Sequence, residues 1–343
     1  ALADLVRASA LAHQGVVHLR GDGADAADPP LLIMDRHDRD ENLIADLIAQ
    51  RQSLLAPLTT QSQAEADAAI AGIALDDAQR GAVHSVLTRS LTVLTGGPGM
   101  GKTYTLAAII RAAHAGLGAD LRLAVAAPTG KAADVMVGEN VADESMTIAR
   151  AFVGTDDLIP EHTAVKLGWN RDTVVVVDEA GMVSNPDTIR VLETATAAGA
   201  RVVFVGDPEQ YSAVKARSGL LATLSHELPD AVELREVFRQ RDAGEREASK
   251  WLRGGEEADV SRAAEWYMQN KRLHAGSVTA MMDDALAGWR DDTAAGKQSL
   301  LVAATRDQVT ALNAAAQKIR AERGEINPEH RLGPVSYTHL TLP

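Results

Sequence analysis

A glycine-rich octapeptide at residues 96–103 contains the side chains best suited to chemistry in this chain. It reads Gly-Gly-Pro-Gly-Met-Gly-Lys-Thr and fits the phosphate-loop pattern G-x-x-x-x-G-K-[ST]. Its glycines let backbone N–H groups surround a phosphate at a helix N-terminus, where the dipole favours anions. Lys102 could reach the β- and γ-phosphates of a nucleotide, and the Thr103 hydroxyl could bind Mg²⁺. The pattern predicts a Mg²⁺–ATP site whose nucleotide contacts are Gly96, Gly97, Pro98, Gly99, Met100, Gly101, Lys102, Thr103 and Tyr104.

The segments on either side of this loop are those that a phosphate loop requires. Residues 91–95 form a short apolar run that predicts a strand, and residues 104–115 are rich in Ala, Ile and Leu, which predicts a helix. The alternative is a glycine turn before an ordinary helix. The agreement of strand, loop and helix favours the phosphate loop.

Two adjacent carboxylates follow a run of four valines. Asp178 and Glu179 come directly after residues 174–177, which are apolar on both faces, as expected of a central parallel strand. Both carboxylates should therefore lie at the carboxyl edge of the sheet, where open α/β folds bind ligands. Asp178 would bind Mg²⁺, and Glu179 would orient and deprotonate an attacking water. The alternative, two acids that only cap the next helix, is weakened by the phosphate loop upstream.

A third polar element reads Gly-Asp-Pro-Glu-Gln at residues 206–210, after another apolar run. The amide of Gln210 can hydrogen-bond a γ-phosphate and a nearby water, so it could sense the state of the nucleotide. Taken alone, the segment is equally consistent with a simple Gly-Asp-Pro turn.

The order of the expected elements indicates the fold class. Helical segments alternate with strands expected at 91–95, 121–127, 173–178, 201–206 and 299–304. Such alternation predicts an α/β fold of the P-loop NTPase type, with a parallel sheet and helices on both faces.

Composition narrows the possible functions. The chain has 343 residues, 46% of them apolar, which is enough for two domains with substantial cores. It has no cysteine, which excludes disulfides, thiol catalysis and thiolate metal sites. The net charge of −13 argues against nucleic-acid binding through bulk charge but allows a locally basic channel. No apolar run approaches the roughly 20 residues of a membrane span, so we expect a cytoplasmic protein without membrane contacts.

Together, the Walker A loop, the segment Asp-Glu-Ala-Gly-Met at 178–182 and the 206–210 element resemble superfamily 1 helicases. The RecD-like branch, which moves 5′→3′, is the most similar. Residues 75–83 look like the adenine-recognition motif of that branch, and the resemblance implies that Gln79 reads the base. Residues 234–240 look like motif IV, which implies that Arg239 reaches the γ-phosphate from a second motor domain.

Other segments extend the resemblance over about residues 75–320. Residues 126–133 look like motif Ia, and residues 147–150 resemble Thr-x-His-Arg with Ala149 in place of the histidine. Residues 301–313 look like the first strand and DNA-facing loop of the second motor domain. Within the branch, the chain is most similar to the helicase part of TrwC/TraA-type conjugative relaxase–helicases.

The resemblance implies a domain organisation. It consists of an N-terminal accessory region at 1–70, a RecA-like motor domain at 71–230 and an incomplete second RecA-like domain at 231–334. We expect residues 335–343 to be a non-native tail, because their composition departs from that of the body. The family's motifs V and VI do not appear, so we expect a fragment of a longer protein that cannot unwind DNA by itself.

Single-stranded DNA should cross the tops of both motor domains. Short hydroxyl and basic side chains suit contacts to phosphates that are blind to sequence. Tyr211 or Phe152 could stack on a base. Residues 153–172 lie where relatives place a strand-separating pin, although a surface loop is an equal alternative. The expected DNA contacts are Pro128, Thr129, Lys131, Arg150, Tyr211, Thr305 and Arg306.

The sequence thus predicts an ATP-dependent DNA helicase motor that acts in conjugative transfer. Its cofactors would be ATP and Mg²⁺, and its partners single-stranded DNA and conjugation or relaxosome proteins. The alternatives are a RecD-like repair helicase, a P-loop kinase or small-molecule NTPase, and a protein that only binds nucleotide and DNA. The catalytic residues in the main interpretation are Lys102, Glu179, Gln210 and Arg239.

Overall fold

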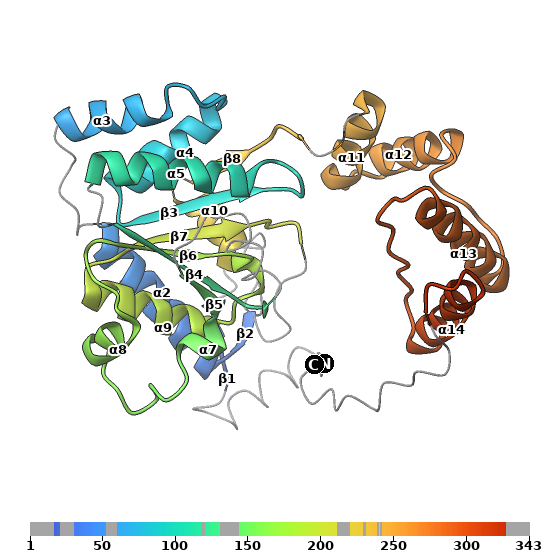
Figure 1. The fold of residues 1–343 in the computed structure, drawn as a ribbon. Coiled ribbons are helices and arrows are strands. Elements are labelled where there is room, and N and C mark those ends of the chain that lie inside the picture. Colours follow the sequence, from blue (N-terminus) through green and yellow to red (C-terminus); the bar gives the residue numbers. More distant parts are fainter. Residues whose placement is uncertain are drawn as a thin grey trace. The chain divides into compact units, whose positions relative to one another are not determined.

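The chain divides into two units, residues 1–246 and 247–343, in the computed structural model (Figure 1). The structure describes residues 17–20, 31–52, 60–117, 121–130, 144–210, 220–228, 231–238, 240 and 242–326. Within the described ranges, no helix has both the length and the apolar character needed to cross a membrane.

A six-stranded sheet with the order β5-β4-β6-β7-β3-β8 forms the centre of the first unit, and every neighbouring pair is parallel. The strands predicted near 91–95, 121–127, 173–178 and 201–206 are all present, which confirms the α/β fold of the P-loop type. The strands are β3 (Leu91–Gly96), β4 (Arg122–Ala127), β5 (Glu144–Thr147), β6 (Thr173–Val177), β7 (Arg201–Gly206) and β8 (Val232–Leu234).

Helices cover both faces of this sheet (Figure 1). One face packs against α3 (Thr60–Ile70), α4 (Asp77–Thr88) and α5 (Lys102–Leu117). The other face packs against α2 (Asp35–Gln52), α9 (Asn185–Ala198) and α10 (Leu220–Glu227). The valines of β6 alternate between the two faces of the sheet. Val174 and Val176 are buried in the core on the first face, and Val175 and Val177 in the core on the second. This explains why the strand reads as an unbroken apolar run.

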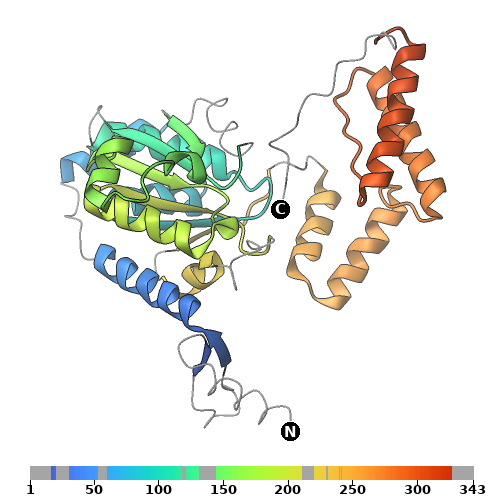
Figure 2. The same ribbon diagram turned by 90° about the horizontal axis from the view of Figure 1, so that it is seen from below.

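Helices α2 and α3 are integral layers of the first unit, although the sequence assigned residues 1–70 to an accessory region. Ile44 and Ile48 of α2 are buried in the core shared with α9, and Ala66 and Ile70 of α3 in the core shared with α5. Ahead of α2, strands β1 (Val17–Arg20) and β2 (Leu31–Met34) form a separate antiparallel pair. Figure 2 shows this pair leading directly into α2.

Arg51, in the last turn of α2, anchors that helix to the amino edge of the sheet. It is 1% exposed. Its guanidinium donates to the Ser90 carbonyl at 2.8 Å, to Thr196 Oγ1 at 2.9 Å and to the Ala200 carbonyl. The Ser90 hydroxyl donates in return to the Arg51 carbonyl. Burial lowers the pKa of Arg51 to about 10. Ser90 and Ala200 directly precede the adjacent strands β3 and β7, so one side chain ties α2 to the start of both.

The first unit extends beyond the predicted boundary at residue 230. Strand β8 pairs in parallel with β3 in the register Leu94↔Val232 and Gly96↔Leu234, and the unit continues to Arg246. The segment expected to open the second motor domain therefore completes the sheet of the first. Its position beside the strand that carries the phosphate loop was not foreseen.

The described part of the second unit is helical. Its helices are α11 (Ala243–Gly254), which begins in the first unit, α12 (Glu257–Gln269), α13 (Val278–Ala294) and α14 (Arg306–Glu322). The strand predicted at 299–304 does not form, and Leu300 and Val302 are 83% and 81% exposed. A strand needs a neighbour with which to pair, and no strand lies within 247–326. The RecA-like character of this unit stays a prediction.

Candidate nucleotide site

The phosphate loop connects β3, which ends at Gly96, to α5, which begins at Lys102, as predicted. Gly99 and Gly101 have φ values of 76° and 82°, in the left-handed region that favours glycine. A Cβ atom at position 101 would lie 3.0 Å from Gln79 Nε2 and 3.4 Å from the Phe238 ring. Both the backbone conformation and the close neighbours therefore require glycine at this position.

Lys102 folds back over the loop. Its Nζ donates to the carbonyl of Gly96 at 2.7 Å and to that of Gly97 at 3.2 Å. One turn into α5, Thr105 Oγ1 donates to the Gly101 carbonyl at 2.9 Å. Thr103 lies half-buried in the first turn of α5, at the helix N-terminus. The ammonium group thus lies against the start of the loop, and Thr103 follows the loop in the first turn of the helix.

Asp178 directly follows β6 and is 8% exposed. Its N–H donates to the Ala126 carbonyl at 3.2 Å, which extends the pairing with β4. Burial raises the pKa of its carboxyl to about 6, and the nearby charge of Glu179 also raises it. The backbone N–H of Glu179 and the charge of Lys102 oppose this rise in the pKa. A buried carboxylate whose charge is only partly compensated suits a bound cation.

Asp178 and Thr103 fit the predicted Mg²⁺ site. Among the described residues, no group of three or more His, Cys, Asp or Glu side chains could hold a metal. Mg²⁺ in nucleotide sites needs only one or two protein ligands, because phosphate oxygens and waters supply the others. Asp178 and Thr103 are a donor set of that kind, at the loop that would hold the phosphates.

Glu179 adopts an unusual backbone conformation. Its φ and ψ are 50° and 42°, left-handed for a residue that is not glycine. Strained residues of this kind cluster at functional sites. The turn that follows, η1 (Ala180–Met182), packs closely against the end of β7, since a Cβ on Gly206 would lie 3.2 Å from Ala180 N and 3.5 Å from Gly181 N. The same Cβ would lie 2.7 Å from Leu221 Cδ2 of α10. Gly206 therefore permits the close approach of η1, which directly follows Glu179.

Gln210 is exposed and held by Asp207. Its Nε2 donates to Asp207 Oδ2 at 3.3 Å, and the N–H of Glu209 donates to Asp207 Oδ1 at 3.1 Å. Asp207 is itself 3% exposed. This carboxylate shapes the turn and orients the glutamine. From the sequence, Asp207 was interpreted only as a turn residue. Its place in the 206–210 element could have indicated its role beside Gln210, but its burial could not be predicted from the sequence.

Gln79 and Phe238 border the loop on its helical side. Gln79 is 2% exposed and caps its own helix, since its Oε1 accepts from Asp76 N at 3.1 Å and its N–H donates to Asp76 Oδ1 at 2.7 Å. The N–H of Phe238 donates to the Gly99 carbonyl at 2.9 Å, while the residue as a whole is 59% exposed. Sequence reasoning missed Phe238, although its position directly before Arg239 in the motif IV segment could have indicated it.

The candidate DNA contacts are only partly brought together. Pro128 and Thr129 directly follow β4, and Arg150 lies in α7 (Ile148–Ala151), directly after the adjacent strand β5. Arg150 is exposed, and its N–H donates to Thr147 Oγ1 at 3.2 Å. In the second unit, Thr305 caps α14 and Arg306 begins it, and both are exposed. Three predicted site residues lie outside the described residues: Lys131, Tyr211 and Arg239.

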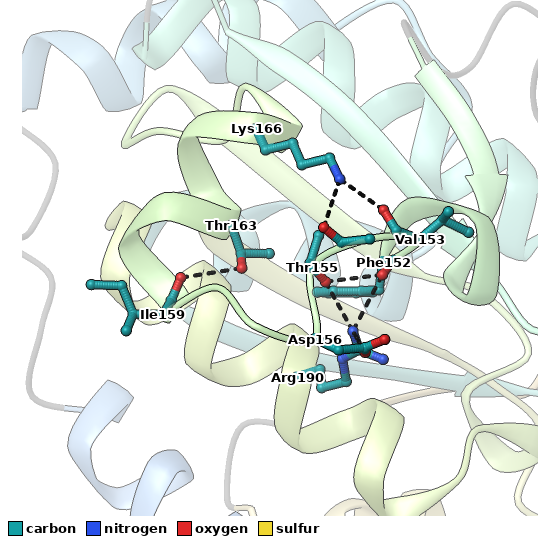
Figure 3. A network of polar contacts seen from close by, with 9 residues as sticks. Phe152, Val153, Thr155, Asp156, Ile159, Thr163, Lys166 and Arg190 are labelled. Carbon is teal, nitrogen blue, oxygen red and sulfur yellow. Dashed lines mark hydrogen bonds and ion pairs between the residues drawn. The ribbon is translucent and has the colours of Figure 1, made fainter.

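Phe152 is a core residue and cannot stack on a base. It is 3% exposed, its ring meets Trp169 edge-on at 6.2 Å, and the Arg190 guanidinium lies 4.8 Å from its centroid. Arg190 also donates to the Phe152 carbonyl at 3.3 Å, to Thr155 Oγ1 at 2.9 Å and to Asp156 Oδ1 at 2.9 Å (Figure 3). The proposed stacking role is therefore wrong for Phe152.

The segment 153–172 contains a short helix, α8 (Pro160–Leu167), which packs on α9. Lys166 Nζ donates to the carbonyls of Val153 at 2.7 Å and Gly154 at 3.1 Å, which closes the loop before the helix (Figure 3). The segment is a compact surface element and contains no hairpin.

Residues 74–278 match the family described as AAA domain. The conjugal transfer protein TraA of Sinorhizobium fredii, described as probable, is 30% identical over 265 residues, which cover 74% of this chain and 22% of that protein. The RecBCD enzyme subunit RecD of Mycolicibacterium smegmatis is 32% identical over 242 residues, 63% of this chain and 40% of that protein.

Among solved structures, the Pif1 helicase from Candida albicans matches with a TM-score of 0.42 and 19% identity, over 70% of this chain and 61% of that one. The chain spans well under half the length of the TraA and RecD relatives named above. The match over residues 74–278 covers more than half of the chain. The chain therefore belongs to the AAA domain family, and it is a RecD-like superfamily 1 helicase sequence related to TraA-type proteins.

Proposed function

We propose that this chain binds and hydrolyses Mg²⁺–ATP as part of a cytoplasmic motor that moves along single-stranded DNA. One observation carries the proposal. Three adjacent strands, β6, β7 and β3, end at the same edge of the sheet in Asp178–Glu179, the 206–210 element and the phosphate loop. The acid pair, the Gln210 amide and the phosphate loop are the parts that phosphoryl transfer to water requires.

The nucleotide would be held by the loop and the residues around it. Lys102 Nζ, which donates to two loop carbonyls, would transfer its hydrogen bonds to phosphate oxygens. Thr103 and Asp178 would bind Mg²⁺, which neutralises phosphate charge when it is present. Gln79, which borders the loop together with Phe238, would contact the base, as the family resemblance implies.

Glu179 and Gln210 are assigned to the attacking water. Glu179 would hold this water and accept its proton, because it is the less buried acid of the pair. Gln210, oriented by Asp207, would report the presence of the γ-phosphate to the rest of the motor. Arg239 would complete the charge stabilisation, as the family resemblance implies.

DNA would lie along the carboxyl edge near Pro128, Thr129 and Arg150, which follow two adjacent strands of the same sheet. The similarity to TraA proteins favours a role in conjugative DNA transfer, with relaxosome proteins as partners. The similarity to RecD subunits supports the second candidate, a repair helicase.

The test is an ATPase assay with and without single-stranded DNA on the wild-type chain and its Lys102→Ala variant. Hydrolysis that DNA stimulates and that the substitution abolishes would support the motor. Phosphate transfer to a small-molecule acceptor would indicate a kinase instead. Tight ATP binding without turnover, both with and without single-stranded DNA, would indicate a protein that only binds nucleotide.

A further inference from the structure

A methionine sulfur closes the first half of the phosphate loop. The N–H of Gly97 donates to Met100 Sδ at 2.9 Å, and the N–H of Met100 donates to the Gly97 carbonyl at 3.3 Å. Residues 97 and 100 are therefore tied twice, once through the backbone and once through the side chain. A thioether sulfur is a weak acceptor, so the contact depends on being well positioned and shielded from water.

The surroundings of Met100 hold the sulfur in place. The residue is 6% exposed and belongs to the core cluster that includes Leu234 and Val237. A Cβ atom on Gly96 would lie 3.0 Å from the Leu234 Cβ and 3.5 Å from the Met100 Cβ. Leu234 comes from β8, so the core cluster that surrounds the methionine includes a residue of this strand.

Both backbone polar groups of Gly97 are held. Its N–H is bound by the sulfur, and its carbonyl accepts from the Met100 N–H and from Lys102 Nζ at 3.2 Å. When Lys102 turns to a phosphate, its bond to this carbonyl is lost. The two bonds between residues 97 and 100 do not involve the lysine, so they can preserve the turn.

We propose that Met100 is a positioning residue, whose thioether acceptor pre-forms the phosphate loop before the nucleotide arrives. The proposal rests on the nucleotide site proposed above. A pre-formed loop loses less conformational freedom on binding, so the sulfur contributes to affinity without touching the ligand. Because the sulfur already accepts a hydrogen bond from the Gly97 N–H, the phosphates would be bound by other backbone N–H groups of the loop.

Met100→Leu removes the acceptor and keeps an apolar side chain of similar volume. We expect Mg²⁺–ATP binding, measured by calorimetry, to weaken about three- to tenfold, as for the loss of one net hydrogen bond. Met100→Gln restores an oxygen acceptor and should bind within about twofold of wild type. Met268→Leu, on an exposed methionine of α12, is the matched control and should leave binding unchanged.

The kinetic signature distinguishes positioning from loss of structure. In the ATPase assay, Met100→Leu should raise KM while kcat stays within about twofold, because the contact serves bound nucleotide and transition state alike. ATP binding by the Leu variant as tight as wild type would overturn the proposal. A Gln variant as weak as the Leu variant would overturn it too, since packing alone would then explain the effect.

A measurement on the wild type covers the case in which the Leu variant does not fold. In the nucleotide-free protein, the Gly97 amide proton should exchange with solvent more slowly than in an unfolded peptide, as seen by NMR. Exchange at the unfolded rate would overturn the inference. A wild-type chain that does not bind ATP would contradict the proposed function instead, and the Gly97 measurement would still stand.

Discussion

The adjacent acids Asp178 and Glu179 occupy different environments one peptide bond apart. Asp178 is 8% exposed at the end of β6, whereas Glu179 is more exposed and starts a turn in a left-handed conformation. Environments of this kind push two carboxylates toward different roles. The buried acid is suited to a cation and the more accessible acid to a water molecule.

Glu179→Gln should preserve ATP binding and remove ATP hydrolysis. The amide keeps the size of the side chain but cannot accept a proton from water, and a general base contributes ~10²–10⁴-fold to the rate. Calorimetry and steady-state ATPase measurements on the same preparation test both halves. Turnover within about threefold of wild type would contradict the role of Glu179.

Asp178→Asn should stabilise the nucleotide-free protein at neutral pH. Burial raises the pKa of Asp178 from 3.8 to about 6, so between these values the folded chain keeps a proton that the unfolded chain has lost. Stability is therefore lost as pH rises through this window, and above it the penalty is on the order of 3 kcal/mol. Asparagine carries no charge and avoids the penalty.

Urea unfolding in EDTA at pH 7.5 and pH 4.5 measures this effect. The gain in stability of Asp178→Asn should shrink by about two-thirds at the lower pH, where most of the penalty is absent. A variant less stable than wild type at pH 7.5 would show that the buried charge of Asp178 does not destabilise the folded chain.

Among the secondary-structure elements, those with a strong local pattern in the sequence were predicted best. The four middle strands of the sheet are buried on both faces, so their apolar runs identify them directly. The run at 299–304 carries the same local signal, yet Leu300 and Val302 remain exposed because no described strand pairs with them. Local hydrophobicity indicates that a segment can pair, but pairing also needs a partner.

The parts of the site that sequence reasoning missed depend on distant contacts. Phe238 reaches Gly99, and Leu234 reaches Gly96, only because β8 adds beside β3. Asp207 looked like a turn residue until its burial was known. The opposite error concerned Phe152, whose aromatic ring suggested stacking but lies in the core against Trp169.

Arg51→Met should destabilise the first unit by about 2–5 kcal/mol, because it leaves the Ser90 and Ala200 carbonyls buried without their donor. Chemical denaturation measures the loss. Arg39→Met, on an exposed residue of the same helix, is the control and should change stability by less than about 0.5 kcal/mol. Equal effects of the two substitutions would show that the anchor contributes nothing specific.

The turn between α12 and α13 should respond to pH through His274. Its Nε2 lies 3.1 Å from the Lys271 carbonyl, and its Nδ1 contacts the Asp284 carboxylate. The hydrogen bond to the Lys271 carbonyl, and then that to Asp284, raise the pKa of His274 above 6.5. The stabilisation is complete below the unfolded pKa and is lost as pH rises through the folded one.

An NMR titration of His274 tests this turn. Asp284→Asn should lower the pKa of His274, whereas Asp283→Asn, on the neighbouring exposed aspartate, should leave it nearly unchanged. A pKa of His274 at or below 6.5 in the wild type would show that the contacts do not persist in solution.

At the scale of the whole molecule, the net charge of −13 sets a condition on DNA binding. A chain this acidic repels a polyanion at long range, so binding must come from a few local contacts. Arg150→Ala should then weaken binding of single-stranded DNA and reduce the slope of log K against log salt by about 0.7, the value for one phosphate contact.

Arg171→Ala is the matched control for this experiment. Arg171 is also exposed, but it precedes β6 and so lies at the amino edge of the sheet, away from the phosphate loop. Fluorescence anisotropy over a range of salt concentrations gives both slopes. If Arg171→Ala lowered the slope as much as Arg150→Ala does, the proposal that DNA binds at the carboxyl edge would be wrong.

The strand order of the sheet also determines when the site can assemble during synthesis. Strand β3 is the first strand of the central sheet to leave the ribosome, yet its neighbours β7 and β8 are the last two. Until they emerge, β3 has two open edges that other strands could pair with. Leu234 and Phe238, which brace the phosphate loop, arrive later than any other described residue at its walls. The nascent chain therefore acquires a finished nucleotide site only after synthesis has passed Phe238, well beyond the loop itself.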